Sequence, residues 1–295
     1  MTPHADAHEI PELTTMANDN ARRSFGATSI FNLIKERRSR DALYHSADYW
    51  DARATARTGL ARSIWPSNHF NEVWDERQRA LLQRLLGDVS GHRLVDVGCG
   101  TGRMSRFFAE WGAREVVGLD FSPSTVEAAR EETSSLLADR PEIKARVRFD
   151  VGDVVAGLDH AGVGTFDDAV VLGCFSVACR DLDQLERAMK NVSRLVKPGG
   201  RVLIAEPIHR SPLLRRVLDL GLEEWIGTAN RAGMALLAAT RMGFVPVRLF
   251  CSVRDLPRGV LRPIFNAGES LLDLAPYLAP LSDYKLLMFQ VGAGA

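Results

Sequence analysis

The sequence lacks an excess of charge of either sign. Its 37 Lys and Arg residues are matched by 37 Asp and Glu residues over 295 positions, so the formal net charge is zero. Nonspecific nucleic-acid binding and attachment to an anionic membrane both need a basic surface, so we expect neither nucleic acid nor a membrane as a partner. The content of 46% hydrophobic and 25% charged residues is typical of a globular protein with a substantial core and excludes wholesale disorder.

Cysteine and long apolar runs are also scarce. The four cysteines form no C-x-x-C pair, and no Cys and His cluster has the spacing of zinc ligands, so we expect a reduced, cytoplasmic protein without a metal site. Residues 1–15 contain acidic side chains and no apolar segment of the kind found in signal peptides. The longest uncharged apolar run, residues 169–179, is too short to span a bilayer. We therefore expect neither a signal peptide nor a transmembrane helix.

From residue 92 onward the sequence contains a regular alternation of short apolar runs and amphipathic stretches. The apolar runs predict strands at residues 93–97, 115–119, 145–149, 166–171 and 201–205. The amphipathic stretches predict helices at residues 105–111, 123–137 and 182–196. Such alternation is typical of an α/β fold with a parallel sheet covered on both faces. Beyond it we predict a helix at 229–242, a strand at 245–250 and a last strand at 285–291.

The length fits either two domains or one enlarged domain, and the pattern favours the second. Residues 1–28 are polar and predict a flexible N-terminal tail, residues 29–91 predict a helical cap that includes a helix at 71–86, and residues 92–295 predict the sheet-forming core. Two segments of the core, 207–228 and 252–283, exceed ordinary loop length. We predict that both are helical cap insertions.

The most informative stretch is residues 94–103, LVDVGCGTGR, in which a predicted strand leads into a glycine-rich turn and then a helix. Gly98, Gly100 and Gly102 permit tight turning and let a ligand approach the backbone without interference from a Cβ atom. The next apolar run ends in Asp120, the position at which a doubly wound nucleotide site places an acidic residue for a ribose diol. Together the two signals predict a nucleotide-type site.

This combination resembles class I S-adenosylmethionine-dependent methyltransferases of the small-molecule group. Residues 148–153 (RFDVGD) resemble the family's segment after the third strand, residues 166–175 (FDDAVVLGCF) its fourth strand and exit, and residues 195–206 (LVKPGGRVLIAE) the entry to its fifth strand. The resemblance covers residues 93–291. It implies a Rossmann-like, doubly wound sheet of seven strands, mostly parallel with one antiparallel strand.

The resemblance also implies the cofactor, S-adenosyl-L-methionine, and the residues that hold it. Because this cofactor has no phosphate, the turn of Gly98, Cys99 and Gly100 would admit its methionine part. Asp96 would balance the ammonium group directly or through water, and Asp120 would accept both ribose hydroxyls. The remaining implied contacts are Phe121 and Val154 around the adenine, Asp153 at the adenine amino group, the backbone of Leu172 and Gly173 beside the methionine end, and Tyr49 as an aromatic lid.

Each of these residues also has a structural explanation. The glycines could serve the turn alone, Asp120 could start a helix, and Cys99 could be a small residue without a reactive thiolate. Asp153 could be a solvated loop residue. For Val154, Phe121 and Tyr49 the alternative is ordinary packing.

The methyl acceptor is not specified by any motif. Methyltransferases of nucleobase amino groups or glutamine amides often carry Asn/Asp-Pro-Pro-Tyr at the exit of the fourth strand, where this chain has Leu172-Gly-Cys-Phe175, so those acceptors are disfavoured. A general base matters mainly for a hydroxyl or an acidic carbon. The candidates are His209 and Glu206 near the end of the fifth strand and His69 in the cap. Their structural alternatives are surface histidines and, for Glu206, strand-end hydrogen bonding.

We therefore expect an enzyme that methylates a small-molecule acceptor in specialised metabolism, with O-methylation favoured over C- or N-methylation and a homodimer as an option for its assembly. The alternatives are a noncatalytic binding or scaffolding subunit with this fold and, as a minor one, methylation-coupled cyclisation of an apolar substrate. A Rossmann dehydrogenase is disfavoured because Arg103 stands where the pyrophosphate turn Gly-x-Gly-x-x-Gly has its last glycine.

Overall fold

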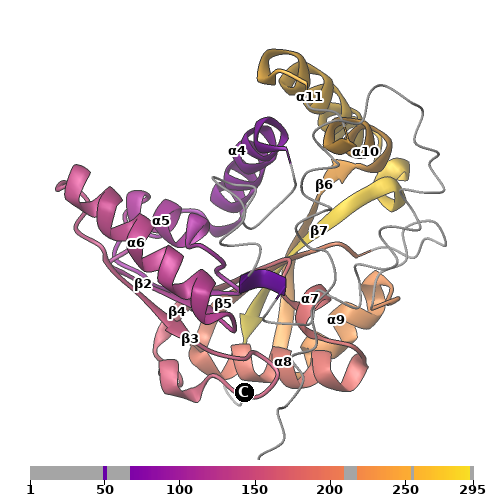
Figure 1. Ribbon diagram of the computed structural model, residues 1–295. Coiled ribbons are helices and arrows are strands. Elements are labelled where there is room, and N and C mark those ends of the chain that lie inside the picture. Colours follow the sequence, from indigo (N-terminus) through magenta and orange to yellow (C-terminus); the bar gives the residue numbers. More distant parts are fainter. Residues whose placement is uncertain (1–48, 52–66, 209–217, 254–255, 293–295) are drawn as a thin grey trace, which may run out of the picture. The chain divides into compact units, whose positions relative to one another are not determined.

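The computed structural model describes residues 49–51, 67–208, 218–253 and 256–292. Within these ranges the chain forms a seven-stranded sheet with helices on both faces (Figure 1), in the strand order β3-β2-β1-β4-β5-β7-β6. The strands are β1 (Arg93–Val97), β2 (Glu115–Asp120), β3 (Arg146–Val151), β4 (Phe166–Leu172), β5 (Val196–Glu206), β6 (Met234–Phe244) and β7 (Ser282–Val291). The predicted tail and most of the predicted cap before residue 67 lie outside the described residues.

The helices divide between the two faces of the sheet. One face is covered by α4 (Asn68–Leu86), α5 (Arg103–Glu110), α6 (Pro123–Asp139), α10 (Val245–Val253) and α11 (Arg258–Leu274). The other is covered by α7 (Phe175–Ala178), α8 (Leu182–Leu195) and α9 (Leu222–Arg231), with the short η2 (Asp159–Ala161) beside α8. A second short helix, η3 (Pro276–Leu281), leads into β7.

The strand directions indicate at which edge of the sheet a ligand would bind. Strands β1 to β5 run parallel, whereas β7 runs antiparallel to both of its neighbours. The predicted mostly parallel, doubly wound sheet is therefore confirmed. Because β7 is antiparallel, its first residues lie beside the carboxyl end of β5, where Lys285 pairs with Glu206. In open α/β sheets ligands bind outside this carboxyl edge.

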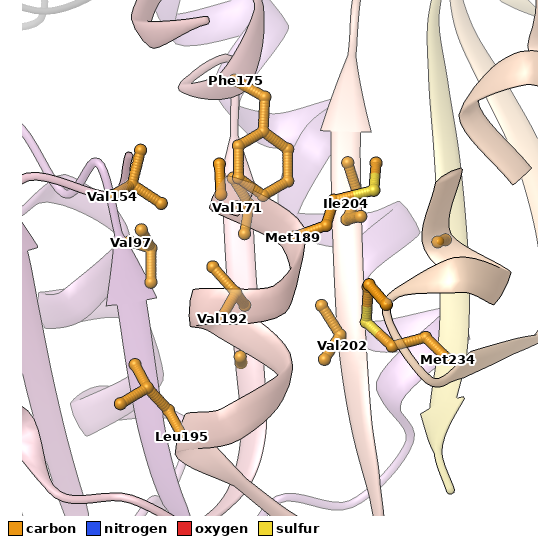
Figure 2. Close-up of a cluster of buried hydrophobic side chains, with 14 of the residues drawn as sticks. Val97, Val154, Val171, Phe175, Met189, Val192, Leu195, Val202, Ile204 and Met234 are labelled. Atoms are coloured by element: carbon orange, nitrogen blue, oxygen red, sulfur yellow. The ribbon is translucent and has the colours of Figure 1, made fainter. Parts of the chain in front are cut away.

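The sheet is held by interdigitated apolar side chains on both faces. Figure 2 shows one of these clusters, in which Val97, Val171 and Ile204 from neighbouring strands face Met189 and Val192 of α8, all at most 1% exposed. Burying an aliphatic side chain of this size contributes about 1.5–3 kcal/mol. The core therefore lies directly below the carboxyl edge and gives the loops there a rigid base.

Two predicted elements after residue 228 are wrong. The predicted helix at 229–242 is the end of α9 followed by β6, and the predicted strand at 245–250 is the helix α10. The alanine and leucine residues of β6 favour a helix by local propensity, but β6 pairs along its length with β7, with a register shift between Leu236 and Ala238. In α10, Pro246 stands in the first turn, a helical position that proline tolerates. Tertiary pairing overrides local preference in both places.

The predicted helices outside the alternating region can be checked in part. The helix predicted at 71–86 is confirmed as α4: Ser67 caps its start by accepting the Phe70 N–H at 3.3 Å, and Gly87 follows its end. Segment 252–283 contains the helices α11 and η3, and its role as a cap insertion stays a prediction. In segment 207–228, the described α9 packs against α8 and β6 and contributes Trp225 to the core. Helix α9 therefore covers one face of the sheet.

Candidate active site at the carboxyl edge

The glycine turn between β1 and α5 has the conformation that its sequence requires. Gly98, Gly100 and Gly102 have φ angles of +74°, +54° and +78°, in the left-handed region that favours glycine. A Cβ atom at Gly98 would lie 2.5 Å from the Cβ of Cys174, so the loop after β4 packs directly on the turn. The turn is also joined to β2, because the N–H of Gly98 donates to the Leu119 carbonyl at 2.7 Å.

Asp120, at the end of β2, is hydrogen-bonded to the glycine turn. Its Oδ2 accepts the Gly100 N–H at 2.9 Å, and its Oδ1 accepts the Ser122 N–H at 3.0 Å and the Thr125 hydroxyl at 3.2 Å. These contacts use three of the roughly four acceptor positions of a carboxylate. Burial is the main cause that raises the pKa of Asp120, against these hydrogen bonds. The carboxylate therefore keeps capacity for a ligand hydroxyl while it holds the turn.

Asp96, in β1, is the second buried carboxylate of the site. It is 2% exposed, and its Oδ2 accepts the Ser105 hydroxyl at 2.7 Å. Burial raises its pKa to about 6; the Ser105 hydrogen bond and the positive charge of Arg103 oppose this rise, and Asp120 adds to it. A cation bound beside Asp96 would favour the ionised form.

These two carboxylates fit S-adenosyl-L-methionine. The cofactor carries an ammonium group, a sulfonium and a ribose diol, which are the groups that buried carboxylates can balance or accept hydrogen bonds from. Asp96 and Asp120 lie on adjacent strands on either side of the glycine turn. The chemistry of these residues is compatible with the cofactor contacts implied by the sequence for Asp96, Asp120 and the turn of Gly98, Cys99 and Gly100, and those contacts stay predictions.

A packing layer below the turn was not predicted from the sequence. A Cβ atom on Gly118 of β2 would lie 2.4 Å from the Phe149 ring and 2.9 Å from the Cys99 sulfur. Cys99 is buried, and burial raises the pKa of its thiol, so it supports the turn as a small packing residue. Glycine within a strand was the signal in the sequence, because it marks a close approach by another group.

The residues predicted around the adenine lie at the ends of β2 and β3, and their roles stay predictions. Phe121 is half-buried directly after Asp120. Val154 is 4% exposed and belongs to the core cluster of Figure 2, so its side chain contributes to packing. Asp153 is exposed, and its Oδ1 accepts the N–H groups of Val155 at 2.8 Å and Ala156 at 3.3 Å. The Asp153 side chain therefore stabilises the turn that it begins.

The segment that contains Tyr49 touches the site through its neighbour. Asp51 accepts a hydrogen bond from the Ser122 hydroxyl and lies 3.3 Å from the Ser124 nitrogen, at the first turn of α6. Tyr49 is half-buried and packs edge-on against Trp50, with ring centroids 5.2 Å apart. The contact through Asp51 brings this segment next to Asp120, although the lid role of Tyr49 stays a prediction. No motif in the sequence marks Asp51.

The loop after β4 forms the other side of the site. Leu172 is half-buried at the end of β4, and Gly173, with φ +68°, donates its N–H to the Ala205 carbonyl at 2.9 Å. Glu206 is fully buried at the end of β5 and accepts the N–H groups of Phe175 at 2.8 Å and Ser176 at 3.3 Å. This is the strand-end hydrogen bonding that was the structural alternative for Glu206. Burial raises its pKa to about 7, against those hydrogen bonds.

Lys285 is a further titratable residue at this edge that the sequence did not mark. Its ammonium donates to the Ser282 carbonyl at 2.7 Å. Burial lowers its pKa to about 8, with Asp283 opposing and Arg241 adding to the shift. Since an amine with this pKa is partly neutral at physiological pH, Lys285 is a candidate base beside the catalytic candidate Glu206.

The two histidine candidates are not brought into the site by the described part of the chain. His69 is exposed in the first turn of α4, and its catalytic role stays a prediction. His209 lies outside the described residues. Within the described ranges no group of His, Cys, Asp or Glu side chains is arranged to hold a metal ion. The helices in these ranges also include none with the length and apolar character needed to cross a bilayer.

The strand order with an antiparallel β7, the glycine turn after β1 and the acidic end of β2 define a class I S-adenosylmethionine-dependent methyltransferase fold. Residues 94–200 match the family described as "Methyltransferase domain". This part of the chain is therefore similar to a methyltransferase domain, in agreement with the resemblance that the sequence motifs indicated.

The chain is similar to several named methyltransferases. It is 30% identical over 176 residues to methyltransferase GfsG of Streptomyces halstedii, covering 56% of this chain and 59% of that protein. It is 30% identical over 133 residues to demethylmenaquinone methyltransferase of Renibacterium salmoninarum, covering 45% and 48%. The chain thus spans about half the length of these relatives.

Among solved structures, the chain is similar in fold to geranyl diphosphate C-methyltransferase from Streptomyces coelicolor A3(2) in complex with Mg²⁺, geranyl diphosphate and S-adenosyl-L-homocysteine. The TM-score is 0.53 with 15% identity, covering 73% of this chain and 79% of that one. At this identity the likeness supports the fold alone.

Proposed function

We propose that the protein is an S-adenosyl-L-methionine-dependent methyltransferase of a small-molecule acceptor. The main support is the hydrogen bond from the Gly100 N–H to Asp120. It connects the carboxylate proposed to bind the ribose with the turn proposed to bind the methionine part of the cofactor. The match of residues 94–200 to the methyltransferase domain supports it. So do the relatives, whose names describe methyl transfer.

In this proposal the cofactor supplies an electrophilic methyl group on a sulfonium. Asp120 accepts a hydrogen bond from the ribose diol, Asp96 balances the ammonium, and the glycine turn leaves room for the methionine part of the cofactor between them. Gly173 and the loop held by Glu206 border the end from which the methyl group leaves. Methyl transfer needs alignment of the reactants and exclusion of water more than it needs a protein nucleophile. The role of these residues is therefore to hold the cofactor and the acceptor in place.

The finer assignments belong to the same proposal. O-methylation is favoured over C- or N-methylation, in specialised metabolism and in the cytoplasm, with the N-terminal cap and the segments 207–228 and 252–283 building the acceptor side. Lys285 at the carboxyl edge, whose pKa burial lowers to about 8, supports O-methylation, since a hydroxyl acceptor must lose a proton. A catalytic role of Glu206 belongs to the same proposal. The balanced net charge supports a small and apolar acceptor.

Cofactor binding is the first test. We expect isothermal titration calorimetry to detect binding of S-adenosyl-L-methionine and S-adenosyl-L-homocysteine but not of NAD. Asp120→Asn should weaken binding by about 10- to 100-fold, because a charge-assisted hydrogen bond contributes about 1.5–3 kcal/mol. The matched control is Asp159→Asn, at a half-exposed residue whose carboxylate pairs with Arg194 on the surface at 2.9 Å; it should bind like the wild type.

The outcomes separate the alternatives. Preferential binding of NAD would reject the methyltransferase assignment in favour of a dehydrogenase. Cofactor binding without any methylated product across a broad acceptor screen, together with a stable complex with another protein, would instead support the noncatalytic subunit.

A further inference from the structure

Tyr284 lies at the carboxyl edge of the sheet, although no motif marks it. It stands in β7 directly before Lys285, whose partner Glu206 forms the last pair between β7 and β5. Its side chain is half-buried and packs against the core cluster on the α4 side, to which Leu172 at the end of β4 also belongs. The residue thus extends from β7 toward the loop that follows β4.

The position of the Tyr284 ring is set by a buried aromatic cluster. Trp74 of α4 meets the ring edge-on, with centroids 5.2 Å apart, and packs in turn against Phe265 of α11 at 6.0 Å. Gly243 of β6 makes this arrangement possible, because a Cβ atom there would lie 3.0 Å from the Trp74 ring. Trp74, itself packed against α11 and β6, therefore restricts the orientation of the Tyr284 ring.

The hydroxyl of Tyr284 lies beside Gly173. The distance from this oxygen to the position of a Cβ atom on Gly173 is 3.5 Å, which is van der Waals contact. Gly173 is the residue whose backbone is expected to border the methionine end of the cofactor, and its N–H is bonded to Ala205 of β5. An acceptor that meets the methyl group there would also meet the phenol.

We propose that Tyr284 is a catalytic residue of the methyl transfer: its hydroxyl donates a hydrogen bond to the acceptor oxygen that receives the methyl group. This inference rests on the proposed function and makes the acceptor a phenol or an enol. In the transfer an oxygen–carbon bond forms and the carbon–sulfur bond breaks, its electron pair stays on sulfur, and the acceptor proton passes to the candidate base Lys285, directly or through one water. A donor fixed by packing stabilises the acceptor as an oxyanion and aligns it.

The test compares Tyr284→Phe with Tyr277→Phe, which removes a hydroxyl from a tyrosine that is 81% exposed. Calorimetry with S-adenosyl-L-homocysteine should give the same affinity for the wild type and both variants. The acceptor probes are 4-nitrocatechol, 1-naphthol and 2-hydroxy-1,4-naphthoquinone. With a labelled methyl donor we expect kcat to fall about 10- to 100-fold in Tyr284→Phe and KM to change less than about threefold, since one oxyanion donor is lost.

A spectroscopic measurement distinguishes a packing role of Tyr284 from a catalytic role. The absorbance of 4-nitrocatechol bound to the complex with S-adenosyl-L-homocysteine reports its ionisation, and the pH midpoint should rise by about one unit in Tyr284→Phe alone. An unchanged kcat and midpoint would overturn the proposal, as would an equal loss of S-adenosyl-L-homocysteine affinity. Wild-type protein that binds the cofactor but labels none of the three probes would reject the oxygen acceptor. Failure of the wild type to bind the cofactor would reject the proposed function itself.

Discussion

At the residue scale, the site residues within the motifs could be proposed from the sequence, whereas the residues that contact them from distant parts of the chain could not. Asp96, Gly98 and Asp120 follow from a strand, a turn and a second strand that adjoin in sequence. In the structure Asp120 accepts the Gly100 N–H of the turn, and Asp96 accepts the Ser105 hydroxyl of the helix after it. Asp51 reaches Ser122 from a segment far away along the chain, and Tyr284 reaches Gly173 from β7. Contacts of this kind depend on strand order, which local patterns do not encode.

Gly98→Ala tests the close packing of the glycine turn. The new Cβ would lie 2.5 Å from the Cβ of Cys174, in addition to the backbone strain at φ +74°. We expect a loss of about 2–4 kcal/mol in the free energy of unfolding, measured by urea denaturation, and weaker binding of S-adenosyl-L-homocysteine.

Gly91→Ala is the matched control for the turn. Gly91 has φ +77° but nothing within 4 Å of an added Cβ, so backbone strain alone should cost about 1–2 kcal/mol and leave binding unchanged. Equal losses in the two variants would show that the contact with Cys174 adds nothing to the backbone strain.

At the scale of the elements, the alternating region could be predicted because its central strands β1, β2 and β4 are short, valine-rich runs that are buried over most of their length. Strand β1 was predicted with the bounds that it has, residues 93–97. The antiparallel end of the sheet could not be predicted in the same way. Strand β6 is an edge strand with exposed Leu236 and Leu237, so its apolar residues do not alternate cleanly between a buried and a solvated face.

Glu269 of α11 holds together the elements at this end of the sheet. It is 3% exposed and accepts the N–H groups of Gly243 at 2.8 Å and Phe244 at 3.2 Å, and the Nε of Arg77 at 3.1 Å. Glu269→Ala would leave the two buried N–H groups without their acceptor, and the half-buried Arg77 guanidinium would keep Asp273 alone as its carboxylate partner. We expect a loss of about 2–4 kcal/mol in the free energy of unfolding, measured by chemical denaturation.

Glu76→Ala is the control for Glu269. Glu76 joins α4 to the same helix through Arg258 and Arg262, but its side chain is 42% exposed. Screened pairs of this kind contribute less than about 1 kcal/mol. If both substitutions cost the same, burial would not be what gives Glu269 its effect.

At the scale of the whole molecule, the buried carboxylates make stability depend on pH. Burial raises the pKa of Glu206 from 4.5 to about 7, so the folded state binds more protons than the unfolded state between these values. Its contribution to stability is therefore fully present below about pH 4.5 and is lost as the pH rises through about 7. Asp96, with its pKa at about 6, acts in the same direction.

Glu206→Gln tests this dependence, because glutamine does not titrate. Between pH 5 and pH 8 we expect the wild type to lose on the order of 1–3 kcal/mol of unfolding free energy more than the variant. The measurement is urea denaturation of both proteins across that range, without cofactor. The variant should be the less stable protein at pH 5, where the protonated wild-type carboxyl keeps its bonds to Phe175 and Ser176, and the difference should shrink as the pH rises. Parallel pH profiles would show that Glu206 does not titrate in this range in the folded protein.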